Sequence, residues 1–220
     1  MMDTGFPSHL LAGHQRFRDG RLTVERARYQ ELAERGQKPE VMLIGCCDSR
    51  AGPELIFDAS PGELFVVRNV AALVPPYQPD GDYHGTSAAL EFGVQALRVK
   101  HVVVMGHGRC GGIAAYLAET MDPLSPGDFI GKWMSLLAPV EQHLGGVNGS
   151  DLNRQTRMEF AAIMQSLTNL RTFPCVQELE RRGKLSLHGA WFDIEKGELF
   201  TLDASKGRFD RAVATAQDVP

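Results

Sequence analysis

Two stretches decide the fold of this chain: VMLIGCCDSR (Val41 to Arg50) and HVVVMGHGRCGG (His101 to Gly112). Each begins with a short apolar run and ends in a cluster of polar and sulfur-containing residues. Short apolar runs bounded by turn residues are typical of buried strands, and ligand-binding loops gather at the carboxyl ends of the strands in parallel sheets. We therefore expect the two polar clusters to meet at one edge of a parallel α/β sheet.

Three residues of these clusters, Cys46, His107 and Cys110, are a complete ligand set for one zinc ion. Zinc binds thiolate sulfur and imidazole nitrogen, and three protein ligands leave the fourth tetrahedral position for water, as in catalytic sites. Taken singly, a cysteine that ends a strand is usually a small buried hydrophobe. The conjunction of two motifs, each following an apolar strand, favours the metal site.

Asp48 and Arg50 complete the string C-x-D-S-R. Zinc lowers the pKa of bound water to about 7, whereas two thiolate ligands work against this lowering. We expect Asp48 to orient the resulting hydroxide by accepting its hydrogen bond. The planar fork of Arg50 would hold the Asp48 carboxylate ionised and directed away from the metal. The alternative for this pair alone is a structural salt bridge in a turn.

Helical and strand patterns alternate along the rest of the chain. We expect a single α/β domain over residues 1–220, with a helical arm at about 8–36 and a catalytic core at about 37–205. Its central sheet should be mostly parallel, with an antiparallel hairpin at one edge and helices on its faces. Thr23 and either Thr86 or Ser87 are the expected N-caps of two of the helices. The expected strands are 41–45, 63–68, 101–105, 185–194 and 199–202, and the expected helices are 10–18, 23–35, 83–98, 111–120, 128–144, 151–170 and 176–182, with a break at Gly145 and Gly146.

Composition excludes several classes of function. The chain has 220 residues, is 43% hydrophobic and carries a formal charge of −4, so it lacks the basic field that nucleic acid or an anionic lipid surface would require. Its apolar runs fall short of the roughly 18 residues that cross a bilayer. Four cysteines, two of them adjacent at Cys46 and Cys47, are a poor disulfide framework and favour metal binding in a reducing compartment. We expect a soluble, cytoplasmic protein.

A competing motif overlaps the second cluster. Gly106 to Gly111 matches G-x-G-x-x-G between a strand and a helix, which is the context of a dinucleotide-binding loop. That class of enzyme needs an acidic residue about 20 positions further on, at the end of a second strand. Here Asp128 lies in MDPLSPGDF, which contains two prolines and no strand pattern. A non-catalytic zinc module is a third alternative, but it has no need of Asp48 and Arg50.

Several segments together resemble a beta-class carbonic anhydrase: CCDSR, GELFVVRNVA (Gly62 to Ala71), HVVVMGHGRCGG, NLRTFP (Asn169 to Pro174) and LHGAWFDIEKGEL (Leu187 to Leu199). The resemblance runs from about Gly36 to Asp203. It implies reversible hydration of carbon dioxide to bicarbonate and a proton, with one zinc per subunit on Cys46, His107 and Cys110. Hydrolysis of carbonyl sulfide or carbon disulfide at the same site is the alternative.

The resemblance also implies an assembly and a substrate pocket. It implies a homodimer built by exchange of the N-terminal helices, often paired into a tetramer, with the active sites at the subunit interface. Gln37, Phe65 and Phe92 match the substrate pocket of the family, and Phe92 stands where many plant-like members have tyrosine. Arg68 matches an arginine found broadly in the family; the alternatives for it are to tether the interface or a loop, or to form a buried salt bridge. Cys47 and Cys175 match no ligand position and are expected to be structural.

Two further positions bear on the resting state of the site. Members of the family whose aspartate closes onto zinc resemble one another in having tryptophan and tyrosine at the positions of Leu43 and Phe192. Neither Leu43 nor Phe192 can donate a side-chain hydrogen bond to a bound anion. We therefore expect an open site, with Asp48 paired to Arg50 and no cooperative inhibition by bicarbonate.

Overall fold

The computed structural model describes residues 5–79, 84–118, 122–141 and 152–213. The chain divides into two compact units, Met1–Lys38 and Pro39–Pro220. Within the described residues, no helix is both long enough and apolar enough to cross a membrane.

The N-terminal unit consists of two helices, α1 (Ser8–Asp19) and α2 (Arg21–Arg35). They are separated by Gly20 and contact each other through Phe17 and Tyr29, whose rings lie edge to face with centroids 5.9 Å apart. Neither helix buries a single residue. The prediction that Thr23 caps the second helix was wrong: α2 starts two residues earlier, and the Thr23 hydroxyl donates a hydrogen bond back to the Gly20 carbonyl at 2.6 Å.

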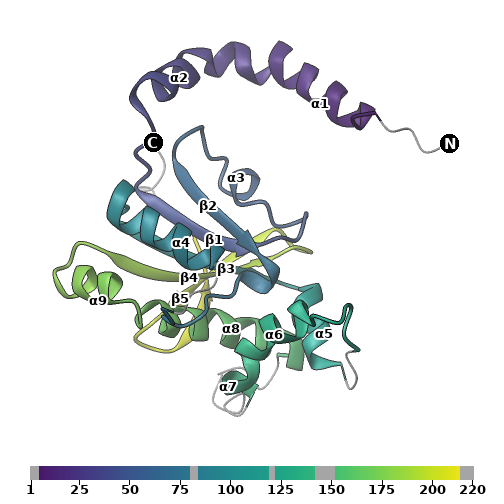
Figure 1. Ribbon diagram of the computed structural model, residues 1–220, viewed down its shortest axis with the longest axis vertical. Helices are drawn as coiled ribbons and strands as arrows, with labels where there is room; N and C mark the ends of the chain where they lie inside the picture. The colour runs from purple at the N-terminus through teal and green to yellow at the C-terminus, as the bar shows by residue number, and fades with distance from the viewer. Residues whose placement is uncertain (1–4, 80–83, 119–121, 142–151, 214–220) are drawn as a thin grey trace. The chain divides into compact units, whose positions relative to one another are not determined.

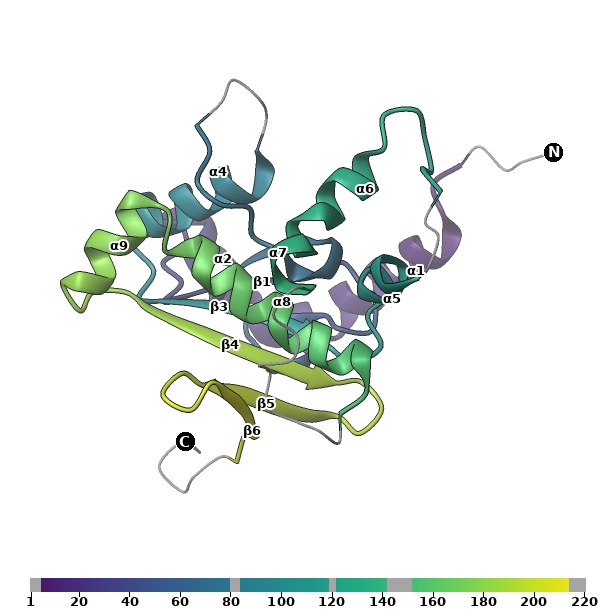
Figure 2. The same ribbon diagram turned by 90° about the horizontal axis from the view of Figure 1, so that it is seen from below.

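The larger unit is built on a six-stranded sheet with the order β2-β1-β3-β4-β5-β6. The three pairs β2/β1, β1/β3 and β3/β4 are parallel, and β4/β5 and β5/β6 are antiparallel. This confirms the predicted mostly parallel sheet with an antiparallel edge (Figures 1 and 2). The sequence analysis missed β6, so the sheet extends beyond the expected end of the core at about 205. The strands are β1 (Val41–Cys46), β2 (Leu64–Asn69), β3 (His101–His107), β4 (Ser186–Asp193), β5 (Glu198–Asp203) and β6 (Arg208–Arg211).

Helix α8 (Arg154–Leu170) packs against β3 and β4 and supplies much of one face of the core, as Figure 2 shows. It presents Phe160, Ile163 and Leu167 to the sheet residues Val102 and Val104 in one buried cluster. Burial of such side chains contributes about 1.5 to 3 kcal/mol each. The remaining helices are α3 (Pro53–Ile56), α4 (Gly85–Glu91), α5 (Gly111–Leu117), α6 (Phe129–Met134), α7 (Ala138–Glu141) and α9 (Pro174–Arg181), together with 3-10 turns at Val70–Ala72 and Ser135–Leu137.

The predicted helix 83–98 differs from the structure at both ends. Helix α4 starts at Gly85 with His84 in the N-cap position, so neither Thr86 nor Ser87 is the cap. From Phe92 the chain continues as a π-helix, η2 (Phe92–Leu97). Inside it, Gly93 packs so closely on β1 that a side chain would come within 2.9 Å of the Met42 sulfur. It would also come within 3.2 Å of the Phe65 ring, so a larger residue here would have to displace both neighbours.

Two other predicted helices are shorter than expected. Within the described residues 128–141, the chain forms α6, a 3-10 turn and α7 in succession. Helix α8 begins at Arg154, because the Asn153 side chain accepts a hydrogen bond from the Thr156 N–H at 2.8 Å and caps it. Some positions of the predicted helices lie outside the described residues, as does the predicted break between two of them. These positions are Tyr83, 119–120, 142–144 and Asp151, and the break is at Gly145 and Gly146.

Candidate metal centre

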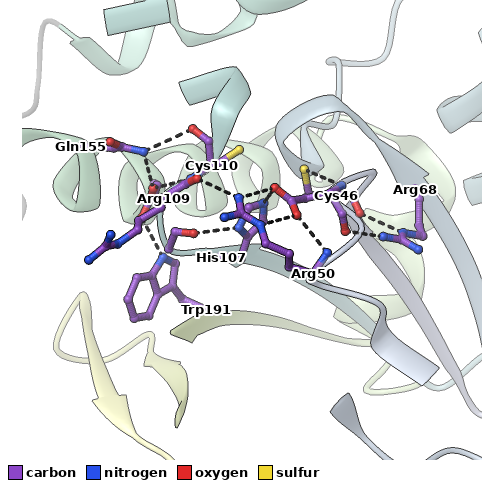
Figure 3. Close-up of polar contacts among 11 residues, drawn as sticks. Cys46, Arg50, Arg68, His107, Arg109, Cys110, Gln155 and Trp191 are labelled. Carbon is purple, nitrogen blue, oxygen red and sulfur yellow. Dashed lines mark hydrogen bonds and ion pairs between the residues drawn. The ribbon is translucent and has the colours of Figure 1, made fainter. Parts of the chain in front are cut away.

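The two motifs meet where β1 and β3 end. Cys46 is the last residue of β1, His107 is the last residue of β3, and Cys110 is in the N-cap position of α5. Because β1 and β3 are parallel neighbours, their carboxyl ends lie side by side and bring the three side chains together (Figure 3). The two sulfur atoms and an imidazole nitrogen lie within 4.8 Å of one another, and each residue is at most 5% exposed.

The His107 ring is oriented for a metal. Its Nδ1 lies 2.9 Å from the Gly108 carbonyl, which can only accept, so Nδ1 carries the proton. Its Nε2 is therefore the basic nitrogen. That atom is buried and has no hydrogen-bond partner among the described residues. A buried acceptor without a donor is costly, and a metal ion held together with the two sulfur atoms would satisfy it. The site thus fits zinc.

The two sulfur atoms form a hydrogen bond that shifts the pKa values of Cys46 and Cys110 in opposite directions. A hydrogen bond from Cys110, aided by His107, holds the pKa of the Cys46 thiol well below its usual range. The same contact, with burial, raises the pKa of Cys110. Metal binding requires both sulfurs as thiolates, so binding of a metal by these two residues would be accompanied by proton release.

Asp48 and Arg50 form the dyad expected from the sequence. Arg50 donates from Nε to Oδ1 of Asp48 at 2.9 Å and from Nη2 to Oδ2 at 2.7 Å, while its backbone N–H also donates to Oδ1. These hydrogen bonds hold the pKa of Asp48 well below its usual range. Asp48 Oδ2 lies 3.8 Å from His107 Nε2, so the carboxylate sits beside the three ligands.

Two arginines fix the loop that carries the dyad. Arg68 on β2 donates to the Cys46 carbonyl at 2.9 Å and to the Asp48 carbonyl at 2.6 Å, so within this chain it tethers the loop (Figure 3). Arg50 Nη2 also donates to the Arg109 carbonyl at 3.3 Å, which connects the C-x-D-S-R loop to the second motif. The side chain of Arg109 in turn forms an ion pair with Glu195 in the β4–β5 turn.

Glu159 is the residue of this centre that the sequence analysis missed. It lies on α8, is 3% exposed, and accepts hydrogen bonds from the Cys110 backbone N–H at 3.0 Å and from Trp191 Nε1 at 3.0 Å. Gln155, one turn earlier, donates to Glu159 and to the Cys110 carbonyl (Figure 3). Burial raises the pKa of Glu159, against the effect of these donors. The only signal in the sequence is an acidic residue within a predicted helix that also carries many apolar residues.

The glycines of the second motif allow close packing at the centre. A side chain on Gly108 would come within 3.0 Å of the Trp191 ring, and one on Gly106 within 2.9 Å of Ile163. The Gly108 N–H donates to the Phe192 carbonyl at 2.9 Å. The glycine pattern therefore serves packing on β4 and α8. Asp128, which a dinucleotide site would have needed at a strand end, instead caps α6.

Two of the three expected substrate-pocket residues, Phe65 and Phe92, do not lie at the ligands of this chain's own centre. Phe65 and Phe92 contact each other, with ring centroids 5.9 Å apart. Phe65 pairs with Met42 in the β1/β2 ladder, four residues before the pair of Cys46 and Asn69, which corresponds to about 13 Å along the strands. Gln37 belongs to the N-terminal unit.

Comparison with known proteins agrees with this geometry. The family model described as carbonic anhydrase matches residues 41–199. A carbonic anhydrase of Pseudomonas aeruginosa is 34% identical over 91% of this chain and 89% of its own length. The chloroplastic beta carbonic anhydrase 5 of Arabidopsis thaliana is 37% identical over 82% of this chain and 60% of its own length.

Solved structures give the same result. The beta-carbonic anhydrase CcaA superposes with a TM-score of 0.82 at 31% identity, covering 94% of this chain and 92% of that one. The Coccomyxa beta-carbonic anhydrase, solved in complex with acetazolamide, superposes with a TM-score of 0.76 at 29% identity, over 90% of this chain and 87% of that one. The chain therefore belongs to the beta-class carbonic anhydrase family, as its sequence motifs indicated.

Proposed function

We propose that this protein catalyses the reversible hydration of carbon dioxide to bicarbonate and a proton, using one zinc ion per subunit held by Cys46, His107 and Cys110. The observation that carries the proposal is a buried ligand set of two sulfurs and one nitrogen beside a carboxylate that an arginine holds in place. When bound, zinc supplies a Lewis acid that lowers the pKa of water to about 7.

Asp48 supplies the acceptor for this chemistry. Held ionised by Arg50, its carboxylate can only accept hydrogen bonds, so it orients a hydroxyl group by accepting that group's hydrogen bond. The Arg50 fork keeps both carboxylate oxygens engaged, which opposes their movement onto the metal. A non-catalytic zinc module would not require this second pair of residues.

We further propose that Gln37, Phe65 and Phe92 complete the active site of the partner subunit. Within one chain, Phe65 lies about 13 Å along the sheet from the Cys46 end, while Phe92 is 51% exposed. Phe92 would form an apolar wall for carbon dioxide, and the Gln37 amide would hydrogen-bond bicarbonate. A C2 interface is isologous, so each subunit could receive these residues from the other.

The proposed assembly is a homodimer or a pair of homodimers. Helices α1 and α2 bury none of their own residues and expose Leu10, Leu11 and Val24. Apolar surface of this kind is typical of association. A beta-carbonic anhydrase chain of Sordaria macrospora that is 27% identical to this chain comes from one of two enzymes described as tetrameric. The four free cysteines are consistent with a reducing, cytoplasmic location.

The test is a zinc assay combined with stopped-flow measurement of carbon dioxide hydration. We expect about one zinc per subunit and fast hydration that falls when zinc is removed by a chelator and returns when zinc is restored. Stoichiometric zinc without turnover would instead identify a non-catalytic module. Faster turnover of carbonyl sulfide or carbon disulfide than of carbon dioxide would reassign the substrate.

A further inference from the structure

A cavity lies at the opposite end of the sheet from the metal centre. It has a volume of about 790 Å³. His101, one of its lining residues, is the first residue of β3, whereas the expected metal ligand His107 is the last. We call this cavity the amino-edge groove. It lies between η2, the starts of β3 and β4, and α9 with the turn that follows it. The residues that line it are Val94, Gln95, Arg98, Val99, Lys100, His101, Cys175, Glu178, Leu179, Gly183, Lys184 and Ser186.

Part of the groove wall is apolar and fixed. Val94 and Val99 are each 2% exposed and belong to the main hydrophobic core, and Leu179 packs against the same cluster. Cys175, a half-buried thiol on α9, also lines the groove. An apolar wall anchored in the core offers a preformed surface to the hydrocarbon or aromatic part of a ligand.

The groove also has uncompensated positive charge. Arg98 and Lys184 form no side-chain hydrogen bond or ion pair with any other described residue. The other charged groups of the lining are already paired: Glu178 binds Arg181 at 2.9 Å and also Arg182, and Lys100 binds Glu40. Arg98 and Lys184 therefore remain for a ligand and favour an anion, although the charge of the Glu91 carboxylate also acts on Cys175 in the same groove.

The backbone that carries Arg98 supports a binding role. Arg98 ends the π-helix η2 in the left-handed conformation, with φ 58° and ψ 46°. Glycine or asparagine usually occupies such a position, because a longer side chain strains it. Single-turn π-helical segments are rare and occur frequently at functional sites.

We propose that the amino-edge groove binds a small organic anion with an apolar body. Its carboxylate or phosphate group would pair with Arg98 and Lys184, and its body would lie against Val94, Val99 and Leu179. The proposal is independent of carbon dioxide hydration, because no residue of the groove belongs to the metal centre.

Binding in the groove can be measured by how far a ligand protects the Cys175 thiol from alkylation. The zinc-loaded protein is treated with iodoacetamide at alkaline pH, since burial raises the pKa of the Cys175 thiol and only the thiolate reacts. The rate of alkylation at Cys175 is measured by peptide mass in the presence of phenyl phosphate, hexanoate, inorganic phosphate or benzyl alcohol. We expect phenyl phosphate or hexanoate to slow the reaction in a saturable manner. If only phenyl phosphate protects Cys175, the ligand carries a phosphate group, and if only hexanoate protects it, the ligand carries a carboxylate.

The matched variants are Arg98→Ala/Lys184→Ala in the groove and Lys206→Ala/Arg208→Ala in the β5–β6 region. The groove variant should need at least about tenfold more probe for the same protection, as expected for the loss of charge-assisted contacts, while its hydration rate stays unchanged. The control variant should behave like the parent protein.

Four results would overturn the proposal. In the first, neither phenyl phosphate nor hexanoate slows the alkylation of Cys175. In the second, benzyl alcohol or inorganic phosphate slows it equally well. In the third, the organic anions protect Cys175 in the groove variant as well as in the parent protein. In the fourth, Cys175 is alkylated only in the Lys184→Glu variant, and only together with a fall in the oligomeric mass. That result would show that a second copy of the chain fills the groove in the parent protein.

Discussion

Glu159 and Cys110 are joined by a buried hydrogen bond, in which the carboxylate on α8 accepts from the backbone N–H of this expected metal ligand at 3.0 Å. The same carboxylate accepts from Trp191. Groups that orient metal ligands in this way typically change metal affinity by 10- to 100-fold when they are replaced. Glu159 therefore belongs to the metal centre, although it is not itself one of the three expected ligands.

Replacing Glu159 by Gln should destabilise both the centre and the fold. The amide presents two N–H groups to a site that already contains three donors, so at least one of them loses its acceptor, at a cost of about 1 to 3 kcal/mol. We expect the zinc dissociation constant to rise by about 10- to 100-fold. Chelator competition and chemical denaturation measure the two effects. Glu54→Gln, on an exposed helix, is the control and should change neither.

The pH dependence of stability should change in the same variant. Because the pKa of Glu159 is raised in the folded protein, its contribution is fully present below the unfolded value of about 4.3 and is lost as the pH rises through the folded value. Glu159→Gln removes this loss. Denaturation midpoints of the metal-free proteins between pH 5 and 8 should therefore converge with increasing pH. Parallel curves would show that the carboxylate is not the responsible group.

Asp48→Asn should separate metal binding from catalysis. Asparagine keeps the size of the side chain but cannot serve as an ionised acceptor, so hydration should fall by about 10²-fold or more while zinc content stays near one per subunit. Arg50→Lys should also lose activity, because an ammonium cannot form the two parallel hydrogen bonds. Normal turnover in both variants would show that Asp48 and Arg50 only stabilise a turn and take no part in catalysis.

Cys110→Ser should lose most of the zinc, since a hydroxyl is a poor substitute for a thiolate ligand. Cys175→Ser is the matched control, because it removes a thiol remote from the centre and should retain zinc. Metal analysis of the purified proteins measures both. Full zinc in Cys110→Ser would remove this residue from the ligand set.

Mixing two inactive variants tests whether the active site is shared between subunits. Asp48→Asn carries an intact Gln37 and Phe65, and Gln37→Ala/Phe65→Ala carries an intact Asp48. If each site takes these residues from the partner, random mixed dimers should recover activity at about a quarter of all sites. Stopped-flow hydration after subunit exchange measures the recovery. An assay that stays at the level of the unmixed variants would place all the residues of a site in one chain.

Bicarbonate should inhibit without cooperativity. Asp48 is held by Arg50, and neither the buried Leu43 nor Phe192 can donate a hydrogen bond to an anion. The pKa of Asp48 is lower in the folded protein than the unfolded value of about 3.9. The stability that the Asp48–Arg50 pair contributes is therefore fully present above a pH of about 3.9 and is lost only as the pH falls through the folded pKa. Activity measured against bicarbonate at neutral pH should decline hyperbolically, and a steep sigmoidal decline would contradict an open site.

The strands and the ligand cluster could be predicted because both depend on local pattern. Apolar runs mark β1 and β3, and parallel strands bring their ends together, so Cys46, His107 and Cys110 had to meet. The partner of Cys110 could not be predicted in this way. Glu159 lies 49 residues further along the chain, and only the packing of α8 on the sheet places its carboxylate under the second motif.

The helix starts were less predictable for a similar reason. Thr23 and Thr86 are good capping residues by type, but the break at Gly20 and the packing of Thr86 against Asn69 determine where the helices lie. The short strand β6 was missed because its sequence RFDR has little β pattern of its own. It pairs only because the turn after β5 returns the chain to that edge.

Helix α8 should not tolerate an insertion or a deletion of a residue. Gln155, Glu159, Ser166 and Asn169 lie on one stripe, and they bind Cys110, Trp191 and the loop at 72–74. Deleting or inserting one residue within the helix would rotate part of this stripe by about 100° and separate the two loops it joins. Engineered length variants of this enzyme should therefore survive in the turn at 204–207 and fail between 155 and 169.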